Sequence, residues 1–316
     1  MEIYRYSDHL PAFNKPVVTV GTFDGVHLGH RRIIDRLKEI ARQIQGETIV
    51  ITFEPHPRLV LAQYGTPVKL INSTYRKYQL LSDLGIDHLI ILPFSVEFSM
   101  TPWEVFIREY IINQIHTSYL VVGYDHRFGH DRQGDRSKLQ AFAHELGLNI
   151  EEVPPLFIEG QVVSSTRIRN ALHAGNIRLA NLLLGYEYSI SGKVIRGNRL
   201  GHRLGFPTAN ILADDSLALI AANGVYVSRV EYKGKIYGGM SNIGIRPTIA
   251  HHSFAIEVHI FDFNEEIYDE MINISFIDRL RDEIRFDSLD QLKDQLQEDR
   301  ILARKILQEV GNDVDL

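Results

Sequence analysis

Short apolar runs alternate with stretches of helical periodicity through the first half of the chain. Four residues at 17–20, VVTV, predict a buried strand, and apolar positions from Ile33 to Ile44 recur at helical spacing directly after it. The alternation continues with strands predicted at 48–53, 88–92, 119–122 and 150–153, and helices at 74–84, 102–114 and 137–146. Strands joined by helices form right-handed crossovers, so we predict an α/β domain with a doubly wound parallel sheet.

The pattern changes after Gly185, which ends an apolar helix predicted at 172–184. Strand patterns then follow one another without helices between them, at 188–196, 225–232, 236–242 and 254–261. Lys233-Gly234 predicts a hairpin turn, and 289–310 predicts a closing helix. We therefore predict two domains, 1–185 and 186–316, the second mostly β and built on a small antiparallel barrel with a C-terminal helix.

Length and composition narrow the class of protein. A chain of 316 residues is long enough for two domains, and 44% hydrophobic and 23% charged residues are typical of a globular protein. The net charge of −6 argues against bulk binding of nucleic acid, and the lack of cysteine excludes disulfides and thiolate metal sites. There is no signal-peptide core and no run of about eighteen apolar residues, so we expect a cytoplasmic protein with no membrane partner.

The turn between the first strand and the first helix carries candidate chemistry. Gly21 opens it, and His27, Gly29 and His30 stand where the helix begins. Such a turn directs backbone N–H groups and the positive helix end at an anion, although neither GxGxxG nor GxxxxGK[ST] is present. Imidazoles here can donate to nucleotide phosphates and stabilise charge on a pentacovalent phosphorus. A metal site or a helix cap is the alternative.

Other polar loops fall at strand ends or at a helix start. His56, between two prolines, follows the second strand at the sheet edge where ligands bind in open α/β sheets; the alternative is a plain loop histidine. The polar loop at 123–129 follows the fourth strand, and its alternative is a solvated turn. Residues 164–169 place hydroxyls at a helix start, and a capping box alone would not need Arg167 and Arg169.

A glycine-rich segment and one strand carry the candidate chemistry of the second half. The segment 197–210 has three glycines, which permit close backbone approach, and two arginines, which can meet phosphate; the alternative is a surface loop. Thr208 and Asn210 offer hard neutral oxygens that suit Mg²⁺. In the strand at 254–261, Glu257 and His259 share one face. Glu257 is a candidate acceptor for an alcohol proton, or a solvent-facing strand residue.

Together, these segments resemble those of bacterial bifunctional riboflavin kinase/FAD synthetases. GTFDGVHLGH is similar to the HxGH motif of nucleotidyltransferases, and TFEPHP, VGYDHRFG and SSTRIR are similar to the TFxPHP, VGxDxxFG and SSTxIR motifs. GHRLGFPTAN looks like the PTAN motif of riboflavin kinases, EVH like an ExH strand segment, and LRDEIRF like an LRxExKF segment. Arg285 stands where lysine is commoner, Val163 where isoleucine is usual, and His126 where many members carry an aromatic residue.

The resemblance implies two reactions that use ATP and Mg²⁺. Riboflavin would be phosphorylated to FMN in the second domain. FMN would then be adenylylated to FAD in the first domain, with release of pyrophosphate. The resemblance implies that the sheet of the first domain is of the HxGH nucleotidyltransferase type. It implies catalytic roles for His27, His30 and Glu257, and metal binding by Thr208 and Asn210. The residues implied to bind nucleotide in the adenylyltransferase are Gly21, Thr22, Phe23, Asp24, Gly25, Gly29, His56, Ser164, Ser165, Thr166, Arg167 and Arg169. The flavin or nucleotide loop of the adenylyltransferase is implied to contain Asp125, Phe128 and Gly129. The phosphate loop of the kinase is implied to contain Gly197, Gly201, Gly205, Phe206 and Pro207. Arg285 is implied to belong to the flavin loop of the kinase.

Two other functions fit the same sequence. One is a monofunctional adenylyl- or cytidylyltransferase whose barrel only binds flavin. The other is a flavin-sensing regulatory protein that has lost turnover, although a sensor need not keep a base such as Glu257. We expect the small molecules riboflavin, FMN and ATP as partners, and neither nucleic acid nor a membrane. The sequence leaves open the oligomeric state, the transfer of FMN between sites, the preference for reduced flavin and the practical reversibility of adenylylation.

Overall fold

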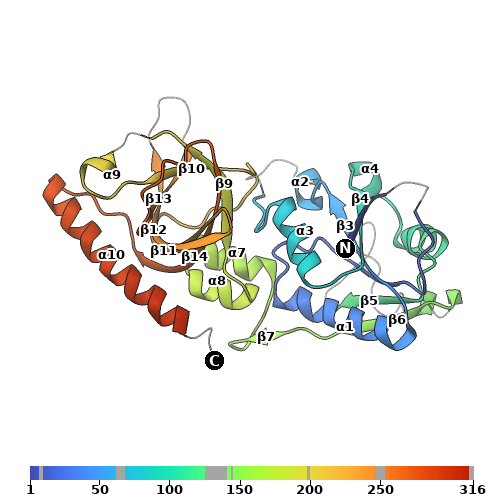
Figure 1. The fold of residues 1–316 in the computed structure, drawn as a ribbon. Helices are drawn as coiled ribbons and strands as arrows, with labels where there is room; N and C mark the ends of the chain where they lie inside the picture. The colour runs from blue at the N-terminus through green and yellow to red at the C-terminus, as the bar shows by residue number, and fades with distance from the viewer. Residues whose placement is uncertain are drawn as a thin grey trace. The chain divides into compact units, whose positions relative to one another are not determined.

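The computed structural model describes residues 1–6, 10–61, 68–124, 141–143, 145–197, 200–246 and 253–312 (Figure 1). The chain forms two compact units, one made of Met1–Lys69 with Thr74–Ser164 and the other of Leu70–Ser73 with Ser165–Leu316. The predicted flavin or nucleotide loop, with Asp125, Phe128 and Gly129, lies outside the described residues. Half of the helix predicted at 137–146 is described, and its residues 141–143 and 145–146 are helical.

The first unit is built on a six-stranded parallel sheet with the order β1-β4-β3-β2-β5-β6, which confirms the predicted α/β architecture. The strands are β1 (Glu2–Arg5), β2 (Val17–Val20), β3 (Thr48–Glu54), β4 (His88–Pro93), β5 (Tyr119–Gly123) and β6 (Asn149–Val153). The chain leaves β2 toward β3 on one side, and β5 pairs on the other side, so the winding reverses at β2. Ligands of open α/β sheets bind at the carboxyl ends of strands beside such a reversal.

Helices cover both faces of this sheet. Helix α1 (Leu28–Ile44) buries Ile34, Leu37, Ile40 and Ala41. The other face, which includes Val18 and Val20, packs against Trp103 and Phe106 in a cluster that contains none of the buried residues of α1. Trp103 therefore belongs to the core of the first unit.

Further helices in the described part of this unit include α2 (Pro57–Leu61), α3 (Thr74–Asp83), α4 (Val96–Ser99) and α5 (Trp103–Val105). The helix predicted at 102–114 is present, but its part at Phe106–Gln114 (η1) has π geometry. In π geometry each backbone N–H bonds to the carbonyl five residues earlier, and this segment buries Phe106, Ile107 and Ile111. A short hairpin of β7 (Phe157–Ile158) and β8 (Gln161–Val162) completes the unit.

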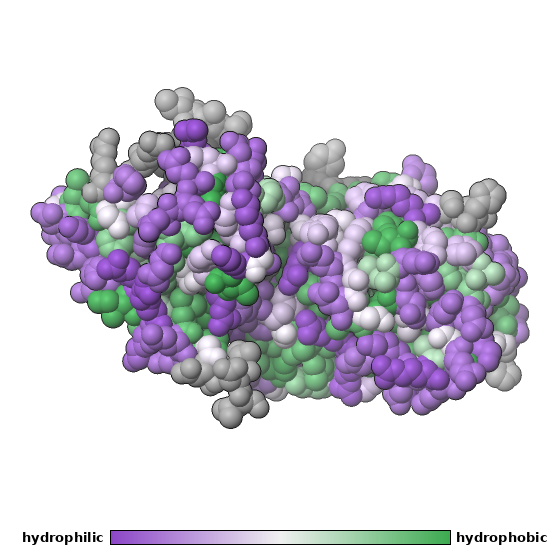
Figure 2. All heavy atoms as spheres, viewed as in Figure 1, coloured by the Kyte–Doolittle hydropathy of each residue, from purple (hydrophilic) through white to green (hydrophobic). Residues whose placement is uncertain are grey.

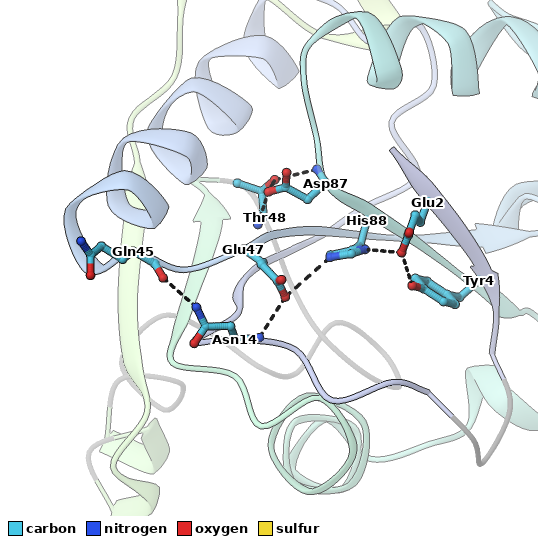
Figure 3. A network of polar contacts seen from close by, with 8 residues as sticks. All are labelled: Glu2, Tyr4, Asn14, Gln45, Glu47, Thr48, Asp87 and His88. Carbon is cyan, nitrogen blue, oxygen red and sulfur yellow. Dashed lines mark hydrogen bonds and ion pairs between the residues drawn. The ribbon is translucent and has the colours of Figure 1, made fainter.

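Polar side chains tie together the amino ends of β1, β3 and β4 (Figure 3). The ring nitrogens of His88 lie 3.6 Å from carboxylate oxygens of Glu2 and Glu47. The Asp87 carboxylate accepts from both the N–H and the hydroxyl of Thr48, at 2.9 and 2.7 Å. These contacts stabilise the amino ends of the strands, whereas the candidate histidine turn at 21–30 follows the carboxyl end of β2.

The second unit contains a closed antiparallel barrel with the order β10-β13-β12-β11-β14-β9, as predicted. The strands are β9 (Ser189–Ile195), β10 (Ala209–Ala213), β11 (Gly224–Tyr232), β12 (Lys235–Arg246), β13 (Ser253–Ile260) and β14 (Met271–Arg281). Lys233 and Gly234 both adopt positive φ, 48° and 75°, and form the predicted hairpin turn between β11 and β12. Helix α10 (Leu289–Asn312) packs Ala303 and Ile306 on the barrel.

Helices α7 (Ser165–His173) and α8 (Ile177–Leu184) belong to the second unit, so the change of unit precedes the division predicted at Gly185. The side chain of Asn181 on α8 explains this grouping, because its amide donates to the carbonyl of Phe276 on β14 at 2.8 Å and its oxygen accepts from the N–H of Tyr188 at 2.8 Å. Functional domains of 1–185 and 186–316 stay a prediction.

The surface view in Figure 2 shows mainly hydrophilic side chains, with smaller hydrophobic areas between them. Among the described residues, no helix has the length and apolar character needed to cross a membrane.

Candidate active sites

The β2–α1 turn, residues 21–27, adopts an unusual backbone. Phe23, Gly25 and Val26 have positive φ values of 49°, 88° and 35°. Glycine takes this conformation freely, but a β-branched valine does so only under strain, which costs on the order of 1–3 kcal/mol per residue. The buried side chains of Phe23 and Val26 hold the backbone in this shape. Strain of this kind is typical of functional turns, and this turn lies at the carboxyl end of β2.

The turn delivers two stacked imidazoles to the start of α1. The rings of His27 and His30 are 3.7 Å apart between centroids and inclined by 13°. His27 is the N-cap residue of α1, and its Nδ1 accepts from the N–H of His30 at 3.3 Å, so the proton of its neutral ring is on Nε2. A Cβ on Gly29 would lie 3.1 Å from the His27 ring and 3.4 Å from the carbonyl of Val163, so the glycine lets these groups close on one another. Ser164 follows directly in sequence.

His30 is held as a neutral ring. Burial, and secondly the proximity of His27, lower the pKa of His30 well below its usual value. Within the described part of the chain its buried Nδ1 has no hydrogen-bond partner. A buried polar atom left in this state costs free energy unless a ligand or water satisfies it. The ring is therefore suited to bind an anionic group that brings its own hydrogen-bonding atoms.

The other predicted nucleotide-binding residues are spread over both units. Asp24 is buried, and a Cβ on Gly21 would lie 3.1 Å from the ring of Phe23. His56 accepts from the N–H of Arg58 at 3.1 Å, which is a capping contact at α2. The residues that begin α7 in the second unit are Ser165, Thr166, Arg167 and Arg169. Their predicted roles stay predictions.

The barrel contains a cavity of about 330 Å³. Its polar lining includes Thr208, Ser241, Asn242, Glu257, His259, Arg281 and Glu283. Its apolar lining includes Leu204, Phe206, Val225, Met240, Ile284, Phe286, Leu292 and Leu296. A cavity with apolar walls and convergent polar groups is typical of a site for a small organic molecule.

Glu257 and Thr208 meet at this cavity. The Thr208 hydroxyl donates to Oε2 of Glu257 at 3.4 Å. Glu257 also stands directly opposite Asn210 in the β10–β13 pairing and opposite Asn242 in the β12–β13 pairing. A Cβ on Gly197 would lie 2.1 Å from Nδ2 of Asn210, so only glycine leaves room for that amide. The fold thus brings Gly197, Thr208 and Asn210 of the segment 197–210 close to Glu257 of strand β13.

His259 fixes the turn that carries Thr208. Its Nδ1–H donates to the carbonyl of Pro207 at 2.8 Å, and the ring of Phe206 lies 5.4 Å away. Burial lowers the pKa of His259, and the bond to Pro207 opposes that shift. The neutral ring keeps the proton that the Pro207 carbonyl needs. Sequence reasoning placed His259 beside Glu257 but assigned it no role.

A second cavity of about 210 Å³ shares Thr208 with the first. Pro207, His202, Phe263 and Tyr268 are among the residues that line it. The three glycines of the segment serve different contacts, because Gly205 has a φ of 83° and a Cβ on Gly201 would lie 2.3 Å from the carbonyl of Phe206. Thr208 therefore stands between two adjoining spaces.

The segment after β14 contributes residues that sequence reasoning missed. Arg281 makes a bidentate ion pair with buried Asp299 of α10, at 2.7 to 3.1 Å, and Asn242 donates to Glu283 at 3.3 Å. Arg285 is exposed and is not among the residues that line the cavity, so its flavin-loop role stays a prediction. No pattern in the sequence pairs position 281 with position 299.

The donors around Thr208 fit a hard cation. The described residues contain no cluster of three His, Asp or Glu side chains able to hold a metal ion unaided. The Thr208 hydroxyl nevertheless meets the Glu257 carboxylate, and Asn210 stands opposite Glu257 in the β10–β13 pairing. Mg²⁺ commonly takes few protein ligands and completes its shell with phosphate and water oxygens, so this donor set is compatible with it.

Comparison with known proteins agrees with this division of sites. A family model for FAD synthetase matches residues 10–167, and one for riboflavin kinase matches residues 184–307. The chain is 36% identical over 309 residues to a bifunctional riboflavin kinase/FMN adenylyltransferase of Buchnera aphidicola, which covers 96% of this chain and 98% of that one. A protein of the same name from Escherichia coli K12 is 37% identical over 291 residues and 92% of each chain.

A solved structure extends the similarity to the fold of the whole chain. A protein of Streptococcus pneumoniae, titled a macrolide-efflux protein, superposes with a TM-score of 0.88 at 32% identity over 96% of this chain and 99% of that one. Two family models in order and relatives similar over nearly their full length lead to one conclusion. The chain belongs to the family of bifunctional riboflavin kinase/FMN adenylyltransferases.

Proposed function

We propose that this protein makes FAD from riboflavin in two steps, each using one ATP. The barrel transfers the γ-phosphoryl group of ATP to riboflavin, giving FMN and ADP. The unit containing His27 and His30 joins FMN to the adenylyl group of a second ATP, giving FAD and pyrophosphate. The observation that carries the proposal is the contact between Glu257, which lines the larger cavity, and Thr208, which lines both cavities, since it supplies a base and a metal ligand at one point.

In the kinase step, the flavin occupies the larger cavity. Its apolar side, formed by residues such as Phe206, Met240 and Leu296, suits a flat aromatic ring system. Its polar side suits the ribityl chain, whose 5′-hydroxyl would lie at Glu257. Glu257 accepts the hydroxyl proton while the oxygen forms a bond to the γ-phosphorus and the bond from that phosphorus to the bridging oxygen of ADP breaks.

ATP occupies the smaller cavity in this proposal. Thr208, which lines both spaces, places the terminal phosphate beside the alcohol. Thr208 and Asn210 would hold Mg²⁺, which neutralises phosphate charge when bound. His259 keeps Thr208 in place through the carbonyl of Pro207. The glycines of the phosphate loop, Gly197, Gly201 and Gly205, leave the backbone accessible to the phosphates.

In the adenylylation step, a phosphate oxygen of FMN forms a bond to the α-phosphorus of ATP, and the bond to the bridging oxygen of pyrophosphate breaks. The imidazoles of His27 and His30 donate to the phosphate oxygens on which charge develops. Ser164, Ser165, Thr166, Arg167 and Arg169 would hold the departing pyrophosphate. No covalent enzyme intermediate is required, because positioning and electrostatic stabilisation supply the rate.

Because both steps use ATP, we place the protein in the cytoplasm.

The proposal is tested with the full-length protein and purified substrates. Riboflavin with ATP and Mg²⁺ should yield FMN and then FAD, separated by chromatography, with ADP and pyrophosphate as the respective co-products. Supplied FMN with ATP should yield FAD and pyrophosphate without ADP. FAD from FMN without FMN from riboflavin would contradict the kinase assignment, and binding of flavin without either product would contradict both.

A further inference from the structure

One buried cation of the first unit has no part in the chemistry described so far. Lys77, on α3, is 9% exposed, which is rare for lysine. Its Nζ donates to the hydroxyl of Thr52 at 3.3 Å and lies 5.6 Å from the ring centroid of Tyr78. An ammonium buried at this depth loses hydration and needs compensation from its surroundings.

A chain of contacts joins this ammonium to the β2–α1 turn. The Thr52 hydroxyl, which is fully buried on β3, donates to the carbonyl of Thr22 at 3.3 Å. Thr22 precedes Phe23, the residue with a φ of 49°, and the ring of Phe23 lies 5.1 Å from the ring of His30. Three successive contacts thus lead from Lys77 to the imidazole that lacks a partner at Nδ1.

Charges around Lys77 come from several elements. Asp24 of the turn and Glu54 at the end of β3 favour the protonated amine, while burial is the larger effect and lowers the pKa of Lys77. Tyr78 donates to Glu54, and Arg5 of β1 lies 3.6 Å from the same carboxylate. The Lys77 ammonium therefore interacts electrostatically with the buried carboxylate of Asp24, which belongs to the turn where phosphates would add negative charge.

We propose that Lys77 is a positioning residue for adenylyl transfer. Its ammonium, acting through Thr52, holds the β2–α1 turn in the strained conformation that places His30. The inference rests on the proposed function. This positioning role of Lys77 differs from a purely structural role. A purely structural residue would affect the stability of the protein and both activities, whereas a positioning residue affects the placement of one imidazole.

The first test compares K77M and K77R with wild type. Methionine keeps the length of the side chain and removes the charge. We expect K77M to lower kcat for FAD formation from FMN on the order of 10- to 100-fold, with a smaller change in KM for ATP, because the residue acts on the placement of His30 during reaction. K77R retains a cation and should recover part of that loss. Riboflavin phosphorylation by the same protein should stay at the wild-type rate.

K38M is the matched control. Lys38 is half-buried in the same unit and donates to the carbonyl of Leu84 at 2.6 Å, far along α1 from its histidine-bearing start. The K38M variant should form FAD at a rate within about twofold of wild type, because surface and near-surface changes of this kind have small effects. Equal losses of FAD formation in K38M and K77M would contradict the inference, because the loss of any lysine contact would then be enough to slow the reaction.

The pH profile separates charge from packing. Because burial lowers the pKa of Lys77, its ammonium loses its proton at a lower pH than an exposed lysine. The ratio of wild-type to K77M adenylylation rates should therefore shrink as pH rises into the alkaline range, while wild type and K77R diverge there because guanidinium stays charged. A ratio that is constant with pH would contradict a role for the charge.

Thr52 supplies a second test that does not depend on K77M folding. T52V removes the hydroxyl at nearly constant volume, and T52S keeps it. T52V should lose FAD formation and T52S should retain most of it, with kinase activity unchanged in both. Wild-type rates in T52V, or in K77M, would overturn the inference alone. A wild-type protein that forms no FAD from FMN would overturn the proposed function and this inference with it.

Discussion

Two imidazoles, His30 and His259, are held neutral by burial, one in each compact unit. The two neutral rings differ in their hydrogen bonds. His259 donates its proton to a carbonyl and fixes a turn, whereas Nδ1 of His30 finds no partner among the described residues. The first is a satisfied structural contact, and the second is a group prepared for a ligand. This contrast at the level of single atoms supports the predicted catalytic role of His30.

Replacing His30 should separate the two activities. In H30A we expect FAD formation from FMN to fall about 10²- to 10³-fold, the usual effect of removing one donor to a charged transition state. FMN formation from riboflavin should be nearly unchanged. His116→Asn, at an exposed position of the same unit with a φ of 56° that asparagine tolerates, is the control. Equal loss of both activities in a folded H30A protein would contradict separate sites.

Replacing Glu257 should have the opposite effect. E257Q keeps the shape of the side chain but cannot take a proton, so FMN formation should fall about 10²- to 10⁴-fold while supplied FMN is still adenylylated. Glu231→Gln, an exposed change on β11, is the control. FMN formation by E257Q at the wild-type rate would show that Glu257 is not the base.

The lowered pKa of His30 also predicts a pH dependence of stability. Because the folded state takes up this proton less readily than the unfolded state, the ring contributes no penalty near neutral pH. As pH falls below about 6.5, the unfolded state binds the proton and the free energy of unfolding decreases. H30N, which cannot titrate, should show a shallower decrease between pH 7 and 5. Urea unfolding followed by fluorescence of Trp103, the single tryptophan, reports the first unit, and identical slopes would contradict the shift.

Elements that carry strong periodicity were predictable, and elements defined by their partners were not. The β2–α1 unit, β3, β4, β5 and the Lys233-Gly234 hairpin follow from local patterns. Strand β1 is mostly exposed and β10 begins inside a glycine-rich segment, so neither stands out locally. Strand β14 does carry a local signal, because Ile272, Ile274 and Phe276 alternate with polar residues, but it was not predicted. The Thr208–Glu257 contact likewise depends on β10 pairing with β13, which no single segment encodes.

The approach of Gly197 to β10 can be tested by adding one carbon. In G197A the new Cβ would lie 2.1 Å from Nδ2 of Asn210, so the amide must move away from the position proposed for metal binding. We expect kinase activity to fall at least 10-fold and to need more Mg²⁺, with FAD formation from FMN unaffected. Gly234→Asn, at the hairpin where a Cβ meets nothing within 4 Å, is the control. Unchanged dependence on Mg²⁺ in G197A would contradict the role given to Asn210.

At the scale of the whole molecule, the chain carries two chemistries on two architectures. The parallel sheet offers a strained turn and a helix start, which suit a nucleotide, while the second unit offers an open cavity lined by both apolar and polar side chains, which suits a flavin. Alternation of helix and strand revealed the first architecture and its absence revealed the second. The grouping of α7 and α8 with the barrel came only from the tertiary contacts of Asn181.

If each reaction is complete within its own site, two defective proteins should complement one another. Neither H30A nor E257Q should convert riboflavin to FAD alone. Mixed in equal amounts with riboflavin, ATP and Mg²⁺, they should form FAD after a lag in which H30A releases FMN to E257Q. The rate should rise with protein concentration. Failure of the mixture, with each remaining half-reaction intact, would show that FMN does not pass through solution.

The alignment of the barrel strands has one more consequence. Asn210, Glu257 and Asn242 stand level with one another on three neighbouring strands. Sliding β13 by a single residue would send Glu257 to the opposite side of the wall and put Ile256 or Val258 in its place. A misthreaded barrel would thus be compact yet catalytically silent. Phosphorylated flavin produced per mole of refolded chain therefore counts the molecules whose strands have found their proper partners.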